Sequence, residues 1–285
     1  MIIKPFLKWQ GGKSKLVEYV DKAFEGPAED YVEPFLGGGA VFFYRQSIGN
    51  IKGTAYLSDL NWKLITTYRT LQKYSAELIT KLASISSIPL SEETYYPLRK
   101  EFNSFSIRDI NSKNEMIRLS VLFIWLNKAC FNGLYRENKS GEFNVPIGRY
   151  QKVALPDNEH LMACSNCLQN AELHYENIFN IIPWTIANCQ IYLDPPYVPL
   201  SATASFTSYN AEDFTWKDQQ RLTQLAIEFS KQNSIVVISN HGTDLIKSEL
   251  YPSPPFEYIE EISLQRAGGA KKSGLMATEL IVRIK

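Results

Sequence analysis

The chain has 285 residues, 45% of them hydrophobic, and its 30 basic residues balance its 30 acidic ones, which suits one large α/β domain with an insertion or two smaller domains. A net charge of zero argues mildly against a nucleic-acid-binding protein, although a neutral total can hide a basic face. No run approaches the ~18 apolar residues of a membrane span, the N-terminus lacks a signal-peptide pattern, and four cysteines make no disulfide framework, so we expect a cytoplasmic protein.

The N-terminal segment combines aromatic residues, glycines and lysines ahead of a predicted helix. Residues 6–13 read Phe-Leu-Lys-Trp-Gln-Gly-Gly-Lys, and apolar residues follow at helical spacing from Leu16 to Phe24. Residues 11–14 are superficially similar to a phosphate-binding loop, but the first glycine of that pattern is missing because position 7 is Leu. A P-loop nucleotidase that binds ATP with magnesium stays a weak alternative, and we favour a segment that cradles one end of a different cofactor.

A strand, a glycine turn and a helix follow. Residues 31–35 form the expected strand, residues 36–40 read Leu-Gly-Gly-Gly-Ala, and a second strand over 55–59 ends at Asp59. Glycines let the backbone pass close to a ligand, and an acid about 20 residues beyond such a turn is placed to accept ribose hydroxyls. The turn is not G-x-G-x-x-G, so a dinucleotide is not its natural ligand.

The middle of the chain has a helical pattern. Leu64, Leu71, Leu78 and Leu82 recur at helix-compatible spacing, and residues 116–126 are a second apolar helix candidate. A stretch rich in Gly and Asn over 132–149 follows, and we expect a hairpin around residues 139–142.

From about residue 158 the strand pattern resumes. We expect strands over 173–175, 190–193, 234–239, 257–262 and 279–284, and Thr215 with Asp218 predicts a capping box for the helix between them. Strands that alternate with helices indicate a sheet with helices on both faces. We divide the chain into a cofactor half over 1–62, an inserted domain over 63–157 and a second half of the sheet domain over 158–285.

The most informative motif is Asp194-Pro195-Pro196-Tyr197, directly after the apolar run 191–193. These residues suit a planar amine such as N6 of adenine, whose lone pair is delocalised into the ring. The Asp194 carboxylate can accept one N–H and the Pro195 carbonyl the other, which localises the lone pair toward an electrophile. Proline adds no competing donor, and Tyr197 offers a face for stacking. A plain Pro-Pro turn with a buried Tyr is the structural alternative.

The glycine turn, the acid and Asp-Pro-Pro-Tyr, in this order, point to S-adenosylmethionine as the shared ligand, with the N-terminal segment at its methionine end. Its product would be S-adenosylhomocysteine, and we expect no metal. The spacing of His160, Cys164, Cys167 and His174 is compatible with a zinc site, but a single C-x-x-C without a second does not establish one. The expected cofactor-binding residues are Trp9, Lys13, Glu33, Pro34, Phe35, Gly37, Gly39, Asp59 and Asp194, to which the family resemblance given next adds Asn177.

These motifs resemble the Dam-type DNA adenine-N6 methyltransferases of class alpha, and the likeness runs nearly end to end. It includes residues 126–128, 131–136 and 141–150, and residues 199–209 after the catalytic motif. The resemblance implies a Rossmann-like α/β fold with a mixed, mostly parallel sheet and an inserted, mainly helical target-recognition domain that carries a β-hairpin. It also implies methyl transfer to N6 of an adenine flipped out of duplex DNA, with GATC as the target. Asp194, Pro195, Pro196 and Tyr197 are then the catalytic residues.

The resemblance also supplies the expected DNA contacts. Phe131 is the candidate wedge, Leu134 could press on a thymine methyl, Arg136 could pair with guanine, and Lys8 matches a lysine that touches the first guanine. Core packing is the alternative for Phe131 and Leu134, and a phosphate contact is the alternative for Arg136. The full set is Lys8, Phe131, Asn132, Leu134, Arg136, Pro146, Arg149 and Tyr150.

Basic residues gather in two further stretches, 128–152 and 266–272, and binding through them should be sensitive to salt. We expect double-stranded DNA as the partner, no membrane, a monomer in solution, a nucleoid-associated location, and a cognate restriction endonuclease that acts separately where one exists. Two other classes stay open: an enzyme of the same fold that methylates RNA or a protein amide, and a DNA-binding regulator without turnover.

Overall fold

The computed structural model describes residues 1–108, 110, 112–180, 187–197, 214–265 and 276–285. The strands are β1 (Asp30–Glu33), β2 (Ala55–Asp59), β3 (Ala171–Tyr175), β4 (Cys189–Leu193), β5 (Ile235–His241), β6 (Glu257–Gln265) and β7 (Met276–Ile284). The helices are α1 (Val17–Ala23), α2 (Ala40–Ser47), α3 (Trp62–Lys73), α4 (Ser75–Ile85), α5 (Glu92–Ser104), α6 (Lys113–Ala129), α7 (Asn158–Cys167), α8 (Trp216–Ser230) and α9 (Asp244–Glu249), with short 3₁₀ turns η1 (Phe131–Gly133) and η2 (Ile178–Asn180).

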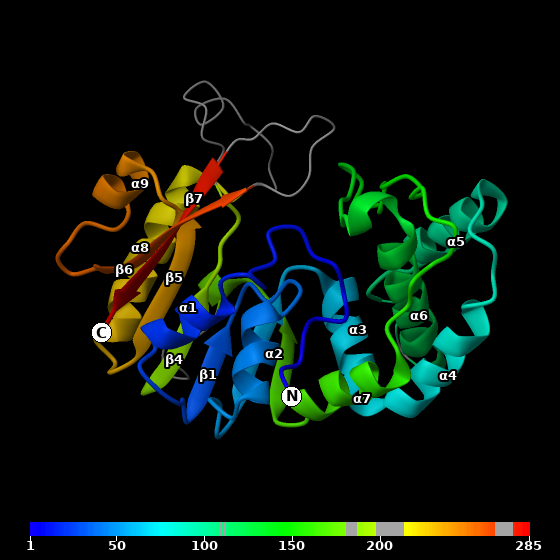
Figure 1. Ribbon diagram of the computed structural model, residues 1–285, viewed down its shortest axis with the longest axis horizontal. Coiled ribbons are helices and arrows are strands. Elements are labelled where there is room, and N and C mark those ends of the chain that lie inside the picture. Colours follow the sequence, from blue (N-terminus) through cyan, green and yellow to red (C-terminus); the bar gives the residue numbers. More distant parts are fainter. Residues whose placement is uncertain (109, 111, 181–186, 198–213, 266–275) are drawn as a thin grey trace. The chain divides into compact units, whose positions relative to one another are not determined.

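The strands of the described residues form one mixed sheet in the order β3-β2-β1-β4-β5-β7-β6. β4 pairs in parallel with both β1 and β5, whereas β7 is antiparallel to β5 and β6 (Figure 1). The expected α/β class with a mixed sheet and alternating helices is thereby confirmed. Each strand predicted from the sequence is present, with bounds that differ by a few residues because strand ends carry little sequence signal.

The sheet carries helices on both faces. β4 is buried along its whole length, as expected for a parallel strand in the middle of an α/β sheet. One face packs against α8, and its core contains Ile191 and Leu193 of β4, Ile238 of β5, and Leu222 and Phe229 of α8. α1 packs on β7 (Figure 1).

The predicted capping box of α8 is confirmed. Thr215 accepts a hydrogen bond from the backbone N–H of Asp218, and the Asp218 carboxylate accepts one from the backbone N–H of Thr215. This reciprocal pair satisfies backbone donors that a helix start otherwise leaves open. It begins α8 at Trp216, which places Gln219 on the buried side of the helix.

The chain divides into two compact units. The first comprises residues 1–15, 36–49 and 57–175, and the second comprises residues 16–35, 50–56 and 176–285. The first contains α2 to α7, and within it the largely buried α6 packs against α3, α4 and α5. The second contains the strands β1 and β4 to β7. The functional division at residues 62 and 157 stays a prediction.

The hairpin expected near residues 139–142 appears as a turn held by backbone pairs. Asn138 N–H donates to the Glu142 carbonyl and Gly141 N–H to the Asn138 carbonyl, each at 2.9 Å. Bridges join Glu137 to Phe143 and Cys130 to Ile147 in the antiparallel sense, and they are isolated bridges rather than full strands. Within the described residues, no helix is long and apolar enough to cross a membrane.

Candidate active site

Two parallel strands end side by side at the site. β1 pairs with β4 with Val32 beside Ile191, so Glu33 at the end of β1 lies close to the residues that lead into Asp194. Ligands of open α/β sheets bind outside the carboxyl ends of such strands. The buried Glu33 carboxylate accepts a 2.7 Å hydrogen bond from the Tyr31 hydroxyl. Glu33 and Asp194, which are far apart in the sequence, therefore both lie at the carboxyl ends of the parallel strands.

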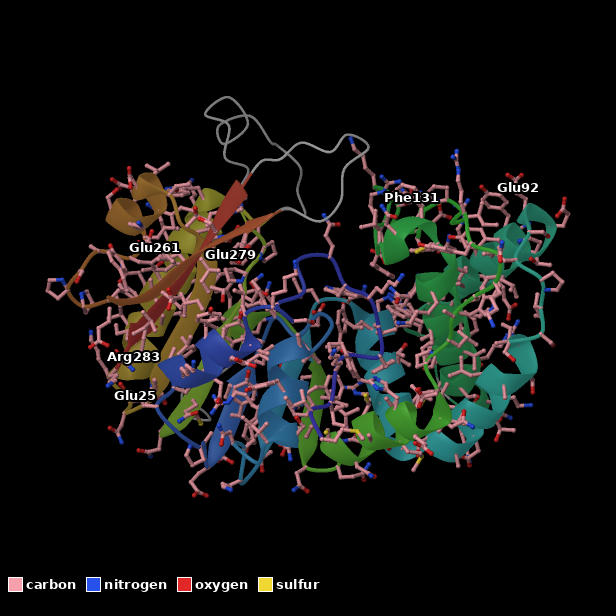
Figure 2. The ribbon with its side chains drawn as sticks, viewed as in Figure 1. Glu25, Glu92, Phe131, Glu261, Glu279 and Arg283 are labelled. Atoms are coloured by element: carbon pink, nitrogen blue, oxygen red, sulfur yellow. The ribbon has the colours of Figure 1, made fainter. Side chains whose placement is uncertain are left out.

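Tyr197 is held from two sides. Its hydroxyl donates a 2.6 Å hydrogen bond to Oε2 of Glu279 on β7, a residue labelled in Figure 2. Its ring meets the ring of His241 edge-on at a centroid distance of 4.4 Å. His241 and Glu279 are register partners on β5 and β7. Burial, followed by the negative charges of Asp194 and Glu279, raises the pKa of Tyr197 well above its ordinary value. The hydroxyl therefore stays a donor at neutral pH, and the ring has a defined orientation.

The glycine turn is fixed by Asp59 and Tyr68. The two Asp59 carboxylate oxygens accept backbone hydrogen bonds of 2.8 Å from Gly37 and Asn61, and the buried Tyr68 hydroxyl donates to the Gly37 carbonyl at 3.0 Å. Burial raises the pKa of Asp59, and the two backbone N–H groups act in the opposite direction. Because a carboxylate offers about four lone-pair sites, Asp59 retains acceptor capacity for hydroxyl groups. Gly39 closes the turn with a left-handed φ of +69°.

Trp9 packs directly on this turn. A Cβ on Gly37 would lie 2.7 Å from Cδ1 and Nε1 of Trp9, and φ at Gly37 is +46°. The Trp9 ring also stacks with the Tyr135 ring at a centroid distance of 5.3 Å, and it lies nearly parallel to the Phe123 ring at a centroid distance of 6.4 Å. The glycine is thus required by packing of the indole as well as by backbone conformation. Lys13, expected in the same segment, is buried and donates from Nζ to the Gly11 carbonyl at 2.9 Å.

We expect Gly37→Ala to destabilise the protein more than Gly11→Ala. Gly11 also has a positive φ, of +74°, but nothing lies within 4 Å of an added Cβ, so this variant carries the conformational cost alone, roughly 1–2 kcal/mol. Gly37→Ala adds overpacking against Trp9, which costs about 1–3 kcal/mol more. Urea unfolding of both variants measures the difference. Equal losses would contradict a packing role for Trp9.

An aromatic cluster surrounds Phe35, which follows β1. Phe35 meets Phe214 edge-on at 5.7 Å, Phe214 stacks with Phe179 at 6.0 Å, and the Arg221 guanidinium lies 4.1 Å over the Phe179 ring. The Asn177 side-chain oxygen accepts a 3.0 Å hydrogen bond from Phe179 N–H and so holds that ring in place. Its Oδ1 keeps a second lone pair and its Nδ2 can donate, and the cofactor contact of Asn177 stays a prediction.

Lys8 is anchored by a buried carboxamide. Its N–H donates to Oδ1 of Asn127 at 2.9 Å, and Nδ2 of Asn127 donates to its carbonyl at 2.8 Å. A Cβ on Gly133 would lie 2.3 Å from Cδ of Lys8, so that glycine leaves room for the lysine stem. The ammonium lies 5.5 Å from the centroid of the Tyr150 ring. Two of the expected DNA contacts, Lys8 and Tyr150, therefore lie next to each other in the first unit.

Phe131 is exposed on the turn η1 (Figure 2). It is 44% exposed, its N–H donates to the Pro146 carbonyl at 2.9 Å, and the next residue, Asn132, has a left-handed φ of +57°. Leu134 is half-buried. Core packing therefore does not account for Phe131, whereas it accounts for part of Leu134. The turn therefore presents an aromatic ring to solvent.

Arg136 and Arg149 are both exposed. The Arg136 Nε donates a 2.8 Å hydrogen bond to Oδ1 of Asn144, which orients the guanidinium from behind. A guanidinium has further N–H groups in a planar fork that match a guanine edge or a phosphate equally well. Pro146 is also exposed, so seven of the eight expected DNA contacts are at the surface and Leu134 is half-buried.

Several residues of the site were not singled out from the sequence: Asn127, Tyr135, Gln219, His241 and Glu279. Asn127 ends the apolar run of α6 and could have been found by that signal, whereas Gln219 lies in a polar stretch of α8 and Tyr135 lies outside helices and strands, so neither carries such a signal. The described residues contain no group of three or more His, Cys, Asp or Glu side chains that could hold a metal ion. Residues 199–209 and 266–272, which carry part of the resemblance and one basic stretch, lie outside the described residues.

Comparison with known proteins gives consistent relatives. The family model described as D12 class N6 adenine-specific DNA methyltransferase matches residues 9–267. The chain is 38% identical to the type II methyltransferase M.MjaIII of Methanocaldococcus jannaschii, over 84% of this chain and 85% of that protein. It is 37% identical to the DNA adenine methylase of Serratia marcescens over 86% of each chain. It is 34% identical to the DNA adenine methylase of Escherichia coli K12 over 94% and 92% of the two chains.

Proposed function

Because the chain belongs to the D12 class of N6 adenine-specific DNA methyltransferases, we propose that it transfers the methyl group of S-adenosylmethionine to an adenine in GATC, flipped out of duplex DNA. The observation that carries the proposal is the Asp194–Tyr197 turn at the end of β4, with the Tyr197 ring fixed by Glu279 and His241. The DNA adenine methylases among the relatives support the substrate class.

The residues of the turn divide the chemistry between them. Asp194 accepts one N–H of the target amine and the Pro195 carbonyl accepts the other, so the nitrogen lone pair points away from both acceptors. The Asp194 carboxylate then stabilises the positive charge that develops on N6. Tyr197 stacks on the extruded base and compensates part of the few kcal/mol that unpairing and unstacking cost. Catalysis by these groups is positioning and electrostatics, without a covalent enzyme intermediate.

The residues at the ends of β1 and β2 are of the chemical types that S-adenosylmethionine requires. Asp59 keeps acceptor sites for ribose hydroxyls, Glu33 is a buried carboxylate suited to a cationic or hydroxyl group, and Phe35 offers an aromatic face. Trp9 and Lys13 belong to the segment assigned to the methionine end. When bound, the cofactor supplies an activated methyl group on a sulfonium. The protein needs no metal for this reaction.

Sequence recognition is assigned to the exposed residues of the first unit. Phe131 inserts where the target base leaves the stack, which explains an aromatic ring that is 44% exposed on a turn held by Pro146. Arg136, oriented by Asn144, reads a guanine through O6 and N7, and Lys8, anchored by Asn127, reads the first guanine. A cognate restriction endonuclease, where one exists, is proposed as a separately acting partner; one of the relatives is named a type II methyltransferase.

The decisive test is transfer of tritiated methyl from S-adenosylmethionine to paired duplexes that differ only by GATC against GTTC. Labelling of the GATC duplex alone is the expected result. Labelling of another adenine context would keep Asp194 and Tyr197 but remove the assignments of Lys8 and Arg136. Labelling of RNA or protein instead of DNA would overturn the substrate.

DNA affinity should fall as the pH rises through about 8. Burial, followed by repulsion from Lys8, lowers the pKa of Lys128 from 10.5 to about 8. Phosphate oxygens favour the charged ammonium, so binding takes up a proton in this range and weakens above it. Lys128→Arg, which stays charged, should abolish the drop, whereas Lys139→Arg at an exposed lysine should retain it. Fluorescence anisotropy with a labelled duplex between about pH 7 and about pH 9 measures the effect.

The lowered pKa of Lys128 also makes the free energy of unfolding depend on pH. The unfolded chain holds the Lys128 proton up to about pH 10.5 and the folded chain only up to about pH 8. Unfolding therefore takes up a proton between these values, and the free energy of unfolding should rise with pH across this window. If the free energy of unfolding changes with pH in this way but the affinity for DNA stays constant from about pH 7 to about pH 9, Lys128 does not contact DNA.

A further inference from the structure

A buried side-chain amide ties the Asp-Pro-Pro-Tyr turn to the core. Gln219 on α8 is 1% exposed, and its Nε2 donates a 2.8 Å hydrogen bond to the Pro196 carbonyl. Its Oε1 accepts a 3.1 Å hydrogen bond from Nδ2 of Asn240, and the same nitrogen donates to the Tyr251 hydroxyl at 2.9 Å. A chain of buried hydrogen bonds thus runs from Tyr251 through two amides to the turn.

Backbone groups at the two ends of this chain fix which side-chain atoms donate and which accept along it. The backbone N–H of His241 can only donate, and it lies 2.8 Å from Oδ1 of Asn240. Nδ2 of Asn240 must therefore face Gln219 and Tyr251, so Gln219 presents its oxygen to Asn240 and its nitrogen to Pro196. The Pro196 carbonyl can only accept, so the chain is satisfied at both ends and neither amide can be reversed without loss.

The turn needs an anchor of this kind because of its own sequence. Pro195 and Pro196 have no backbone N–H, so two consecutive residues cannot hold the turn by donating hydrogen bonds. The two prolines can take part in hydrogen bonds only through their carbonyls, and Gln219 donates to one of these. A glutamine beside Leu222 on the buried face of α8 costs stability unless its amide is hydrogen-bonded. An apolar residue would fill that position without the cost.

We propose that Gln219 is a positioning residue for methyl transfer. By fixing the Pro196 carbonyl it sets the direction of the Pro195 carbonyl and of Asp194, the two groups assigned to the target amine. Tyr197, held by Glu279, provides a second anchor at the next residue. This inference rests on the proposed function of the turn. It adds a residue on α8, 23 positions from Pro196, that acts on the reaction without touching the substrate.

The test compares Gln219→Met and Gln219→Glu with the same changes at the neighbouring, exposed Gln220. Gln219→Met keeps the side-chain length but removes the donor, and we expect kcat to fall about 10- to 100-fold while KM for DNA and for cofactor changes less than about threefold. Met and Glu at position 220 should leave both parameters unchanged, since that side chain faces solvent. The difference between positions isolates the hydrogen bond from general effects of substitution on α8.

Gln219→Glu gives a second readout, provided that kcat is measured below the Tm of the variant at every pH, because an ionised carboxylate at this buried position also destabilises the fold. Protonated, the buried carboxyl can donate to the Pro196 carbonyl, and ionised it cannot, so kcat relative to wild type should recover as the pH falls from about 8.5 to about 6. Asn240, which contacts Gln219, and Tyr251, which contacts Asn240, are both neutral, and burial raises the pKa of Tyr251 so that it stays protonated. The charged groups Asp194 and Glu279 are present in every protein compared, so their titration cancels in the ratio.

The outcomes separate the inference from the function on which it rests. Wild-type protein that transfers no methyl to DNA would overturn the proposed function itself. Wild-type turnover with equal turnover by both Gln219 variants would overturn the positioning role alone. A pH-independent loss in Gln219→Glu, together with a lowered Tm, would show that Gln219 supports only the fold, and would overturn the inference too. Recovery of kcat at low pH supports it even if Gln219→Met fails to fold.

Discussion

Replacing Asp194 with alanine is expected to reduce methyl transfer by at least about 10²–10³-fold, the cost of removing one group that stabilises developing charge. The acid is assigned both to align the adenine amine and to compensate the positive charge that grows on N6. Asp194→Asn keeps one acceptor oxygen but no charge, so it should lie between the wild type and Asp194→Ala. Single-turnover transfer of tritiated methyl to a GATC duplex measures the chemical step directly.

The control for Asp194→Ala is cofactor binding. Its affinity, measured by calorimetry, should change little because Glu33, Phe35 and Asp59 are assigned most of that contact. A large loss of cofactor affinity with intact single-turnover chemistry would move Asp194 from catalysis to binding. Full turnover by Asp194→Ala would contradict the mechanism.

The second large effect is expected at Tyr197, where alanine should be more harmful than phenylalanine. Loss of the ring removes base stacking, about 1–3 kcal/mol or roughly 5- to 150-fold in the affinity for the extruded base. Tyr197→Phe keeps the ring and its contact with His241 but loses the hydrogen bond to Glu279, a cost of about 1–3 kcal/mol where the partner is charged. Part of that cost acts on stability, since the bond lies within the protein.

The two Tyr197 variants are separated by using duplexes with a target base that is already unpaired. A mismatch lowers the cost of extrusion, so it should rescue Tyr197→Ala more than Tyr197→Phe. Glu279→Gln, which keeps an acceptor for the hydroxyl, should resemble Tyr197→Phe or be milder. Equal losses in Tyr197→Ala and Tyr197→Phe on every duplex would contradict a stacking role for the ring.

Much of the fold was predictable because its signals are local. The alternation of apolar runs and turn residues predicted the strands at 190–193 and 279–284, and the pairing of Thr215 with Asp218 predicted the start of α8. Neither depends on where the rest of the chain lies. The turn near residues 138–142 was also expected, but the ladder beside it is reduced to isolated bridges, since pairing length depends on tertiary contacts.

The candidate site was predictable as a set of motifs and less so as a set of contacts. Asp194 and Tyr197 stand out as a four-residue pattern, and the acid at Asp59 stands out by its distance from the glycine turn. That Asp59 accepts the Gly37 N–H, and that Gly37 leaves room for Trp9, depends on packing between residues that are 22 and 28 positions apart. No pattern in the sequence encodes such a contact.

The sequence by itself determined the class of protein, because the motif order and the likeness along residues 9–267 are properties of the chain. It also predicted the strands and the start of α8, because side-chain periodicity and capping act over a few residues. Only the tertiary structure decided what holds the reactive turn: Gln219 on the Pro196 carbonyl, and Glu279 on Tyr197 across 82 residues. The reason is physical, since these hydrogen bonds exist only once strand register and helix packing have brought distant donors and acceptors within 3 Å of each other.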